Sequence, residues 1–176
     1  MTTTLPATEQ PAGPTDAWRA KDAVRTADEI ARMLPHRYPF FLLDRITALE
    51  PGVSATAIKN ISASDGILAG HFPGRMLYPG VLLIECIAQL AAVIYGAEGE
   101  LAGGDDGRVA DRVGYLAEIR HAKFLRPAFP GDQLVVQAHS GARVGNLISV
   151  TGQISIDREP AVQARLAVTQ RPDPTA

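Results

Sequence analysis

Apolar and polar residues alternate most regularly near the C-terminus of the chain. Between Leu147 and Ile156, the side chains of Ile148, Val150, Ile154 and Ile156 fall on one face of an extended segment, and Ser, Thr and Gln fall on the other. A period of two is typical of a strand with one buried face. Similar segments separated by Gly, Pro and Asp predict an antiparallel sheet, with strands expected at residues 40–49, 54–61, 113–121, 134–140, 147–156 and 162–169.

A different pattern occupies the middle of the chain. Val81 to Tyr95 is almost continuously apolar, and its two strongly polar side chains are Glu85 and Gln89. A helix that is apolar around its circumference is expected to be buried, and this stretch is too short to cross a bilayer. Residues four apart share one face of a helix, so Glu85 and Gln89 should lie together. One curved sheet covers only part of such a helix, so a second subunit is expected to cover the rest.

Strands in succession with one segregated helix indicate an α+β domain. Thr26-Ala27-Asp28-Glu29 has the form of a capping box and predicts a short helix that Pro35 ends. Residues 1–25, rich in Thr, Pro and Ala, are predicted to form a disordered arm. The folded domain is expected at 26–170, followed by a tail at 171–176. The Gly- and Asp-rich segment 96–111 is interpreted as a surface loop.

The composition narrows the class of protein. The chain has 176 residues, enough for one domain with one core, and a formal charge of −2, which does not favour nucleic acid or an anionic membrane as a partner. One cysteine, Cys86, excludes an internal disulfide and fits a reducing compartment. Without a signal-peptide pattern at the start, a cytoplasmic protein is expected. No metal-ligand cluster or phosphate-binding loop is present in the sequence, so no metal or cofactor is predicted.

Candidate chemistry lies around a Pro- and Gly-rich loop at residues 70–80. His71 stands in this loop and Glu85 follows in the apolar helix. A buried carboxyl group favours its protonated form and can donate a proton, so the two residues suit acid–base catalysis. The alternatives are a structural histidine and a structural carboxylate paired with a base from elsewhere. The Gly80 amide, at the expected helix start, is a candidate donor to a carbonyl oxygen.

The remaining polar residues give weaker signals. Gln89 either orients Glu85 or bonds to the backbone. His36 is interpreted as structural, and Cys86 as a packing residue. His121 and His139 lie in predicted strands without an obvious partner.

Several motifs in the observed order resemble the 3-hydroxyacyl-[acyl-carrier-protein] dehydratases of type II fatty acid synthesis. The resemblance covers residues 26–170. It rests on Leu34-Pro35-His36-Arg37-Tyr38-Pro39-Phe40, Leu43-Asp44-Arg45, Gly70-His71-Phe72-Pro73-Gly74-Arg75, Pro79-Gly80-Val81-Leu82, Ile84-Glu85, Ala88-Gln89, Lys123-Phe124 to Pro127, and Pro130-Gly131-Asp132.

The resemblance implies a hot-dog fold, in which a curved antiparallel sheet wraps a long central helix. It implies that His71 removes a C2 proton and that Glu85 assists loss of the 3-hydroxyl group. These residues would come from different subunits of a dimer. Glu85, where dehydratase-isomerases carry Asp, favours dehydration without isomerisation. The substrate-binding residues that it implies are Gly80, Gln89, Phe72 and Tyr115.

The implied partners are an acidic acyl carrier protein and a second subunit. The second subunit is either an identical chain, with three dimers forming a hexamer, or a related chain. A basic cluster of Arg112, Arg120, Lys123 and Arg126 is a candidate carrier-protein surface, or else an ordinary solvated face.

Departures from the family pattern leave the pathway open. The chain has Met76-Leu77-Tyr78 where Pro-Val-Met is usual, and Arg120 where Asp is common. Fatty acid synthesis and a dedicated polyketide or polyene pathway are both compatible with this. The competing functions are a hot-dog thioesterase and a non-catalytic subunit of a heteromeric dehydratase.

Overall fold

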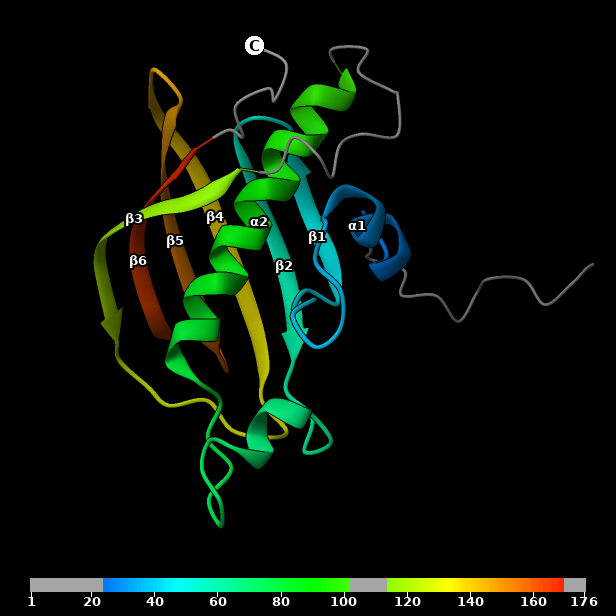
Figure 1. Ribbon diagram of the computed structural model, residues 1–176, viewed down its shortest axis with the longest axis vertical. Helices are drawn as coiled ribbons and strands as arrows, with labels where there is room; N and C mark the ends of the chain where they lie inside the picture. The colour runs from blue at the N-terminus through cyan, green and yellow to red at the C-terminus, as the bar shows by residue number, and fades with distance from the viewer. Residues whose placement is uncertain (1–23, 102–113, 170–176) are drawn as a thin grey trace, which may run out of the picture.

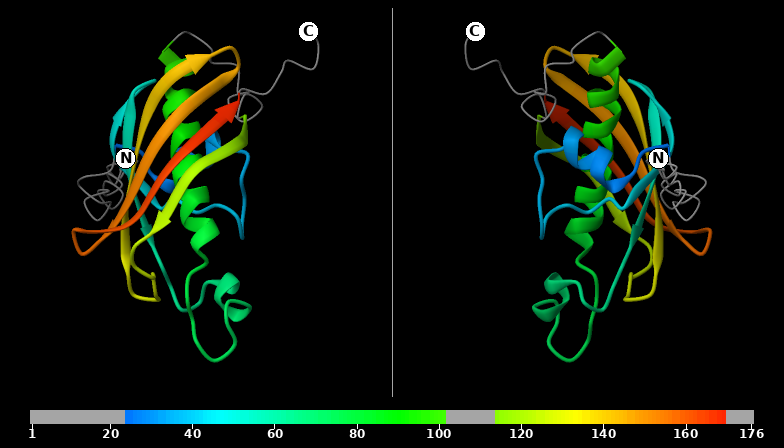
Figure 2. Two further views of the ribbon diagram at one scale, coloured as in Figure 1. Left: turned by 90° about the vertical axis from the view of Figure 1, so that its left-hand side faces the viewer. Right: turned by 90° about the vertical axis from the view of Figure 1, so that its right-hand side faces the viewer.

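The fold is one curved antiparallel sheet around a long helix, as the resemblance implied. The computed structural model describes residues 24–101 and 114–169. Within them the sheet has the strand order β1-β2-β4-β5-β6-β3. Figure 1 shows α2 lying across the inner face of the sheet, and Figure 2 shows the strands curving around it. The strands are β1 (Arg45–Glu50), β2 (Ser54–Asn60), β3 (Tyr115–Phe124), β4 (Gln133–Val144), β5 (Leu147–Ile156) and β6 (Glu159–Thr169).

The central helix, α2 (Gly80–Leu101), has 22 residues and is longer than predicted. The prediction of a surface loop from Gly96 is wrong for residues 96–101, which form the last turn and a half of α2. Ala97 is buried in the core there, and Glu98 forms an ion pair with Arg143 of β4. Residues 102–111 of that loop lie outside the described residues. Among the described residues α2 alone is long and apolar enough to span a membrane. The prediction that the apolar stretch is too short to cross a bilayer therefore does not hold for the full helix. Over half of its most apolar stretch is buried inside the fold, which accounts for its composition.

The first helix, α1 (Ala27–Met33), begins at the predicted capping box. The Glu29 carboxylate accepts the Thr26 backbone N–H at 2.7 Å, and Ile30 and Met33 are buried. Val24 and Arg25, expected in the disordered arm, instead bond to Ile46 of β1. The rest of the arm and the tail at 171–176 lie outside the described residues.

The predicted first strand begins five residues too early. The segment before β1 runs beside α2, where the Leu42 N–H donates to Gln89 Oε1 at 3.1 Å and Phe40 O accepts from Gln89 Nε2 at 2.8 Å. A single side chain thus satisfies the backbone groups that a neighbouring strand would otherwise bond. The connection from β2 to α2 contains one unpredicted turn of 3-10 helix, η2 (Gly66–Ala69).

Within residues 24–101 and 114–169, strand β3 forms one edge of the sheet and pairs only with β6. All ten of its residues are exposed, including Tyr115, Ile119 and Phe124. The far edge of β3 therefore presents apolar side chains beside free backbone groups. An edge strand of this kind is a template for pairing with another chain.

Candidate active site

His71 is held in the loop between η2 and α2 through its ring and its backbone. Its N–H donates to Leu68 O at 3.3 Å, and its carbonyl accepts from Leu77 N at 3.1 Å. Its Nδ1 lies 2.8 Å from Leu77 O. Because a carbonyl oxygen only accepts, Nδ1 must carry a proton, and in the neutral imidazole Nε2 therefore keeps its lone pair. The local fold thus leaves Nε2 of the neutral ring able to accept a proton. The ring of Phe72 stacks on His71 at a centroid distance of 4.0 Å and is 52% exposed.

Glu85 lies one turn from Gln89 on α2, as the four-residue spacing predicted. Gln89 Nε2 donates to Glu85 Oε1 at 3.0 Å. The Gln89 side chain is only 1% exposed, and its contacts with Leu42 and Phe40 fix which end of the amide is the donor. Both interpretations of Gln89 therefore apply, because its side chain bonds to the backbone and also orients Glu85.

His36 is the polar neighbour of Glu85 that the sequence did not reveal. Its Nε2 lies 3.4 Å from Glu85 Oε1, which makes an ion pair when the imidazole is protonated. The ring stacks on Phe40 at 6.1 Å, in the segment that Gln89 anchors. This contact places His36 beside Glu85 and is compatible with the interpretation of His36 as structural. Its contact with Glu85 joins residues far apart in the chain, so no local spacing indicated it.

A cavity of about 510 Å³ runs along α2 between the helix and the inner face of the sheet. Glu85, Gln89 and Tyr115 line it, together with small residues of α2. His71, Phe72 and Gly80 do not line it in the single chain. The lining residues are His36, Phe40, Glu85, Ala88, Gln89, Ala92, Tyr95, Gly96, Glu98, Gly99, Gly114, Tyr115, Leu116, Ile148, Val168 and Thr169.

Gly80 is the first residue of α2, so its N–H has no acceptor within the helix. A Cβ at this position would lie 3.0 Å from the Phe124 ring of β3. Glycine therefore also serves packing here, because it lets the β3 aromatic side chain approach the helix start. The positive end of the helix dipole adds to the attraction of this amide for a carbonyl oxygen.

The remaining predictions concern Cys86, the basic cluster and metal ligands. Cys86 is fully buried, and burial raises the pKa of its thiol to about 12, so it packs as expected. In the basic cluster, Arg120 pairs with Glu118 at 2.9 Å and Arg126 with Asp157 at 3.0 Å, whereas Arg112 lies outside the described residues. Over residues 24–101 and 114–169, no group of His, Cys, Asp and Glu is suited to hold a metal ion.

Comparisons with known proteins agree with the fold. The model of the FabA-like domain matches residues 34–165. The 3-hydroxyacyl-[acyl-carrier-protein] dehydratase FabZ of Geotalea uraniireducens is 38% identical over 142 residues, which cover 81% of this chain and 94% of that protein. The FabZ of Syntrophomonas wolfei is 42% identical over 132 residues, covering 75% and 86%.

Solved structures point the same way. The dehydratase heterocomplex ApeI:P from Xenorhabdus doucetiae superimposes with a TM-score of 0.69 at 26% identity, over 83% of this chain and 92% of that chain. The Escherichia coli PaaI protein, at 16% identity and a TM-score of 0.53 over 72% of this chain and 78% of that one, shares the fold alone. The curved antiparallel sheet around a long helix, with an apolar cavity between them, defines the class as the hot-dog proteins. The chain belongs to the FabA-like family and is a dehydratase of that family.

Proposed function

We propose that the protein removes water from a 3-hydroxyacyl thioester on acyl carrier protein and forms the trans-2-enoyl product. One observation carries the assignment of residues. The imidazole of His71 is fixed as a base at Nε2 by Leu77 O, while Glu85 lines the apolar cavity and is oriented by Gln89. A base and an acid beside an apolar cavity suit the elimination of water from an acyl chain.

The reaction follows from these positions. His71 Nε2 takes a proton from C2, and the C2–H electron pair forms the C2=C3 double bond. The C3–O bond breaks as Glu85 donates a proton, so that the hydroxyl leaves as water. The Gly80 N–H donates to the thioester carbonyl oxygen and stabilises the negative charge that develops there. Proton exchange with solvent then restores both side chains.

A second subunit completes the site in this proposal. The cavity of one chain contains Glu85 but not His71, and the exposed apolar edge of β3 is free to pair with a second copy. Edge-to-edge pairing of two β3 strands would continue the sheet and bring the His71 loop of one chain to the cavity of the other. Val81, 73% exposed at the start of α2, would be covered. Phe72 and Tyr115 would then contact the substrate from the two chains.

The partner is an identical chain in our proposal, and three such dimers can assemble as a hexamer. The similarity to a dehydratase heterocomplex favours a related subunit as the second candidate. The size and turnover of the purified chain distinguish them, because a homo-oligomer is active alone and a half-site is not. We propose a cytoplasmic enzyme of fatty acid synthesis or of a polyketide pathway, because both supply 3-hydroxyacyl chains on acyl carrier protein.

Mass spectrometry of a 3-hydroxyacyl carrier protein tests the function directly. The wild type should remove one water (about 18 Da). The variants His71→Ala and Glu85→Gln should lower turnover roughly 100- to 10,000-fold, as expected for loss of a general base or acid. His139→Ala is the matched control, because this exposed histidine of β4 does not line the cavity. Release of free carrier-protein thiol would instead indicate a thioesterase, and full turnover by His71→Ala would exclude the assigned base.

A further inference from the structure

The strongest unexplained feature outside the acid–base residues is a buried lysine. Lys59 is only 8% exposed, near the end of β2. It pairs in register with the fully buried Leu134 of β4, so its side chain points to the inner face of the sheet. A buried ammonium group is costly unless its surroundings compensate for the lost hydration. The two groups that compensate lie at opposite ends of the loop that carries His71.

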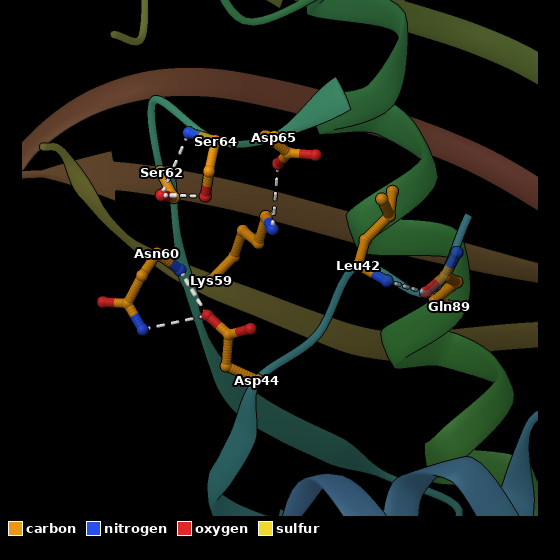
Figure 3. A network of polar contacts seen from close by, with 8 residues as sticks. All are labelled: Leu42, Asp44, Lys59, Asn60, Ser62, Ser64, Asp65 and Gln89. Carbon is orange, nitrogen blue, oxygen red and sulfur yellow. Dashed lines mark hydrogen bonds and ion pairs between the residues drawn. The ribbon is translucent and has the colours of Figure 1, made fainter. Parts of the chain in front are cut away.

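The first compensating group is Asp65, where the connection leaves β2. Lys59 Nζ lies 3.5 Å from Asp65 Oδ2, and the two side chains are 10% and 15% exposed. Figure 3 shows the lysine extending from its strand toward this carboxylate. The Asp65 carbonyl accepts from Leu68 N at 3.0 Å, and the Leu68 carbonyl accepts from His71 N at 3.3 Å. A short chain of bonded residues therefore links the ion pair to the backbone of His71.

The second group is the ring of Tyr78, where the loop reaches α2. Lys59 Nζ lies 5.9 Å from its centroid, within the range of a cation–π contact. Tyr78 is 2% exposed, and its N–H donates to Ala128 O at 2.9 Å. The residue before it, Leu77, accepts from the His71 ring at 2.8 Å. The tyrosine thus anchors the residue that fixes the histidine tautomer.

We propose that Lys59 is a positioning residue for His71, because its one ammonium group joins both ends of the loop from Asp65 to Tyr78. The inference rests on the proposed function, in which His71 is the base. Without the ammonium group the two ends separate, Leu77 O shifts, and Nδ1 loses its fixed acceptor. Nε2 then spends part of its time protonated or displaced, and a displacement of about 1 Å at a catalytic group lowers turnover by up to roughly 100-fold.

The test compares Lys59→Met with Asn60→Ala. Methionine keeps most of the length of the lysine side chain without its charge. Asn60 ends the same strand, but it bonds to Asp44 and Gln133 rather than to the loop, as Figure 3 shows for Asp44. We expect Lys59→Met to lower kcat roughly 10- to 100-fold with KM within about threefold, and Asn60→Ala to leave both unchanged.

A second readout reports on His71 without turnover. Long-range proton–nitrogen NMR spectra of ring-labelled histidine distinguish the tautomers, and His71→Ala identifies the His71 signals among the four histidines. The wild type should show Nδ1 protonated, and Lys59→Met should show a mixture. Unchanged ring signals in Lys59→Met would overturn the inference, whatever its turnover. Unchanged turnover would overturn it as well.

The same experiment separates this inference from the proposed function. Full turnover in His71→Ala refutes the assigned base, whereas the ring signals of Lys59→Met still show whether the lysine holds the loop. If Lys59→Met does not fold, Asp65→Asn takes its place with the same two readouts. That variant keeps the lysine and its contact with Tyr78 while removing one side of the ion pair. Wild-type turnover and ring signals in Asp65→Asn would then refute the positioning role.

Discussion

Gly152 sets how closely α2 approaches the sheet, and Gly152→Ala is the sharpest test of the packing. It lies at the centre of β5 between Ala138 and Ala164, two small buried residues of the neighbouring strands. A Cβ added to Gly152 would meet Ile87 Cγ2 at 2.2 Å and Cδ1 at 2.9 Å. Ordinary contact begins at 3.4 Å, so Ile87 or the helix must move by about 1 Å.

Ile87 is fully buried in the core, where a shift of its side chain disturbs close packing. Overpacking of this kind typically costs 1–3 kcal/mol, so we expect Gly152→Ala to lower the free energy of unfolding by about 2 kcal/mol. Because Ile87 lies between Glu85 and Gln89 on α2, a displaced helix should also lower kcat. Urea denaturation measures the first effect and the dehydration assay the second.

The double variant Gly152→Ala/Ile87→Ala tests the cause. Ile87→Ala alone should cost about 2–5 kcal/mol, but the new methyl group partly fills the cavity that it leaves, so the combined cost should fall short of the sum by about 1–2 kcal/mol. Gly70→Ala is the control, because its added Cβ would meet nothing closer than 4.0 Å and its φ of −99° suits alanine. Additive costs, or a Gly152→Ala variant as stable as the wild type, would refute the reasoning.

Three further predictions concern single side chains. Gln89→Leu should lower the free energy of unfolding by about 2–5 kcal/mol, measured in urea, because two main-chain groups lose their partner, and kcat should fall with it. Cys86 should react with a thiol reagent only as fast as the protein unfolds, since burial raises its pKa to about 12; rapid labelling at pH 8 would contradict this. The Thr26 hydrogen bonds lower the pKa of Glu29 below its ordinary value of 4.5. The stability that they contribute should therefore be present above pH 4.5 and be lost as the pH falls through the lowered pKa of the folded protein. Melting curves recorded as a function of pH should show this loss in the wild type but not in Glu29→Ala.

The alternation of residues predicted the sheet because strands with one buried face repeat every two residues. It failed at Phe40–Asp44, where apolar residues continue but the backbone bonds to a glutamine side chain from α2. No local pattern encodes such a partner. The helix end was misjudged because Gly96 suggested a break, whereas the buried Ala97 and the Glu98–Arg143 pair extend the helix.

The contact between Glu85 and Gln89 followed from helical spacing, which depends only on neighbours in the chain. The contacts of His36 and Lys59 did not. His36 reaches Glu85 from a segment that packs on α2, and Lys59 meets Asp65 and Tyr78 only where the chain after β2 folds back over the lysine. Family resemblance indicated the motifs that contain His36 and His71 without showing what those side chains touch. Polar contacts between distant segments therefore emerged only from the folded chain.

The three bonds of Gln89 also bear on redesign of the substrate range. Both amide hydrogens and the carbonyl oxygen of this side chain are engaged, with Phe40, Glu85 and Leu42. A substitution there alters the acid, the neighbouring segment and the cavity wall together, so its effects cannot be tuned separately. Ala88 and Ala92 line the same cavity without such ties. A library meant to change the accepted acyl chain should vary those alanines and keep the glutamine constant.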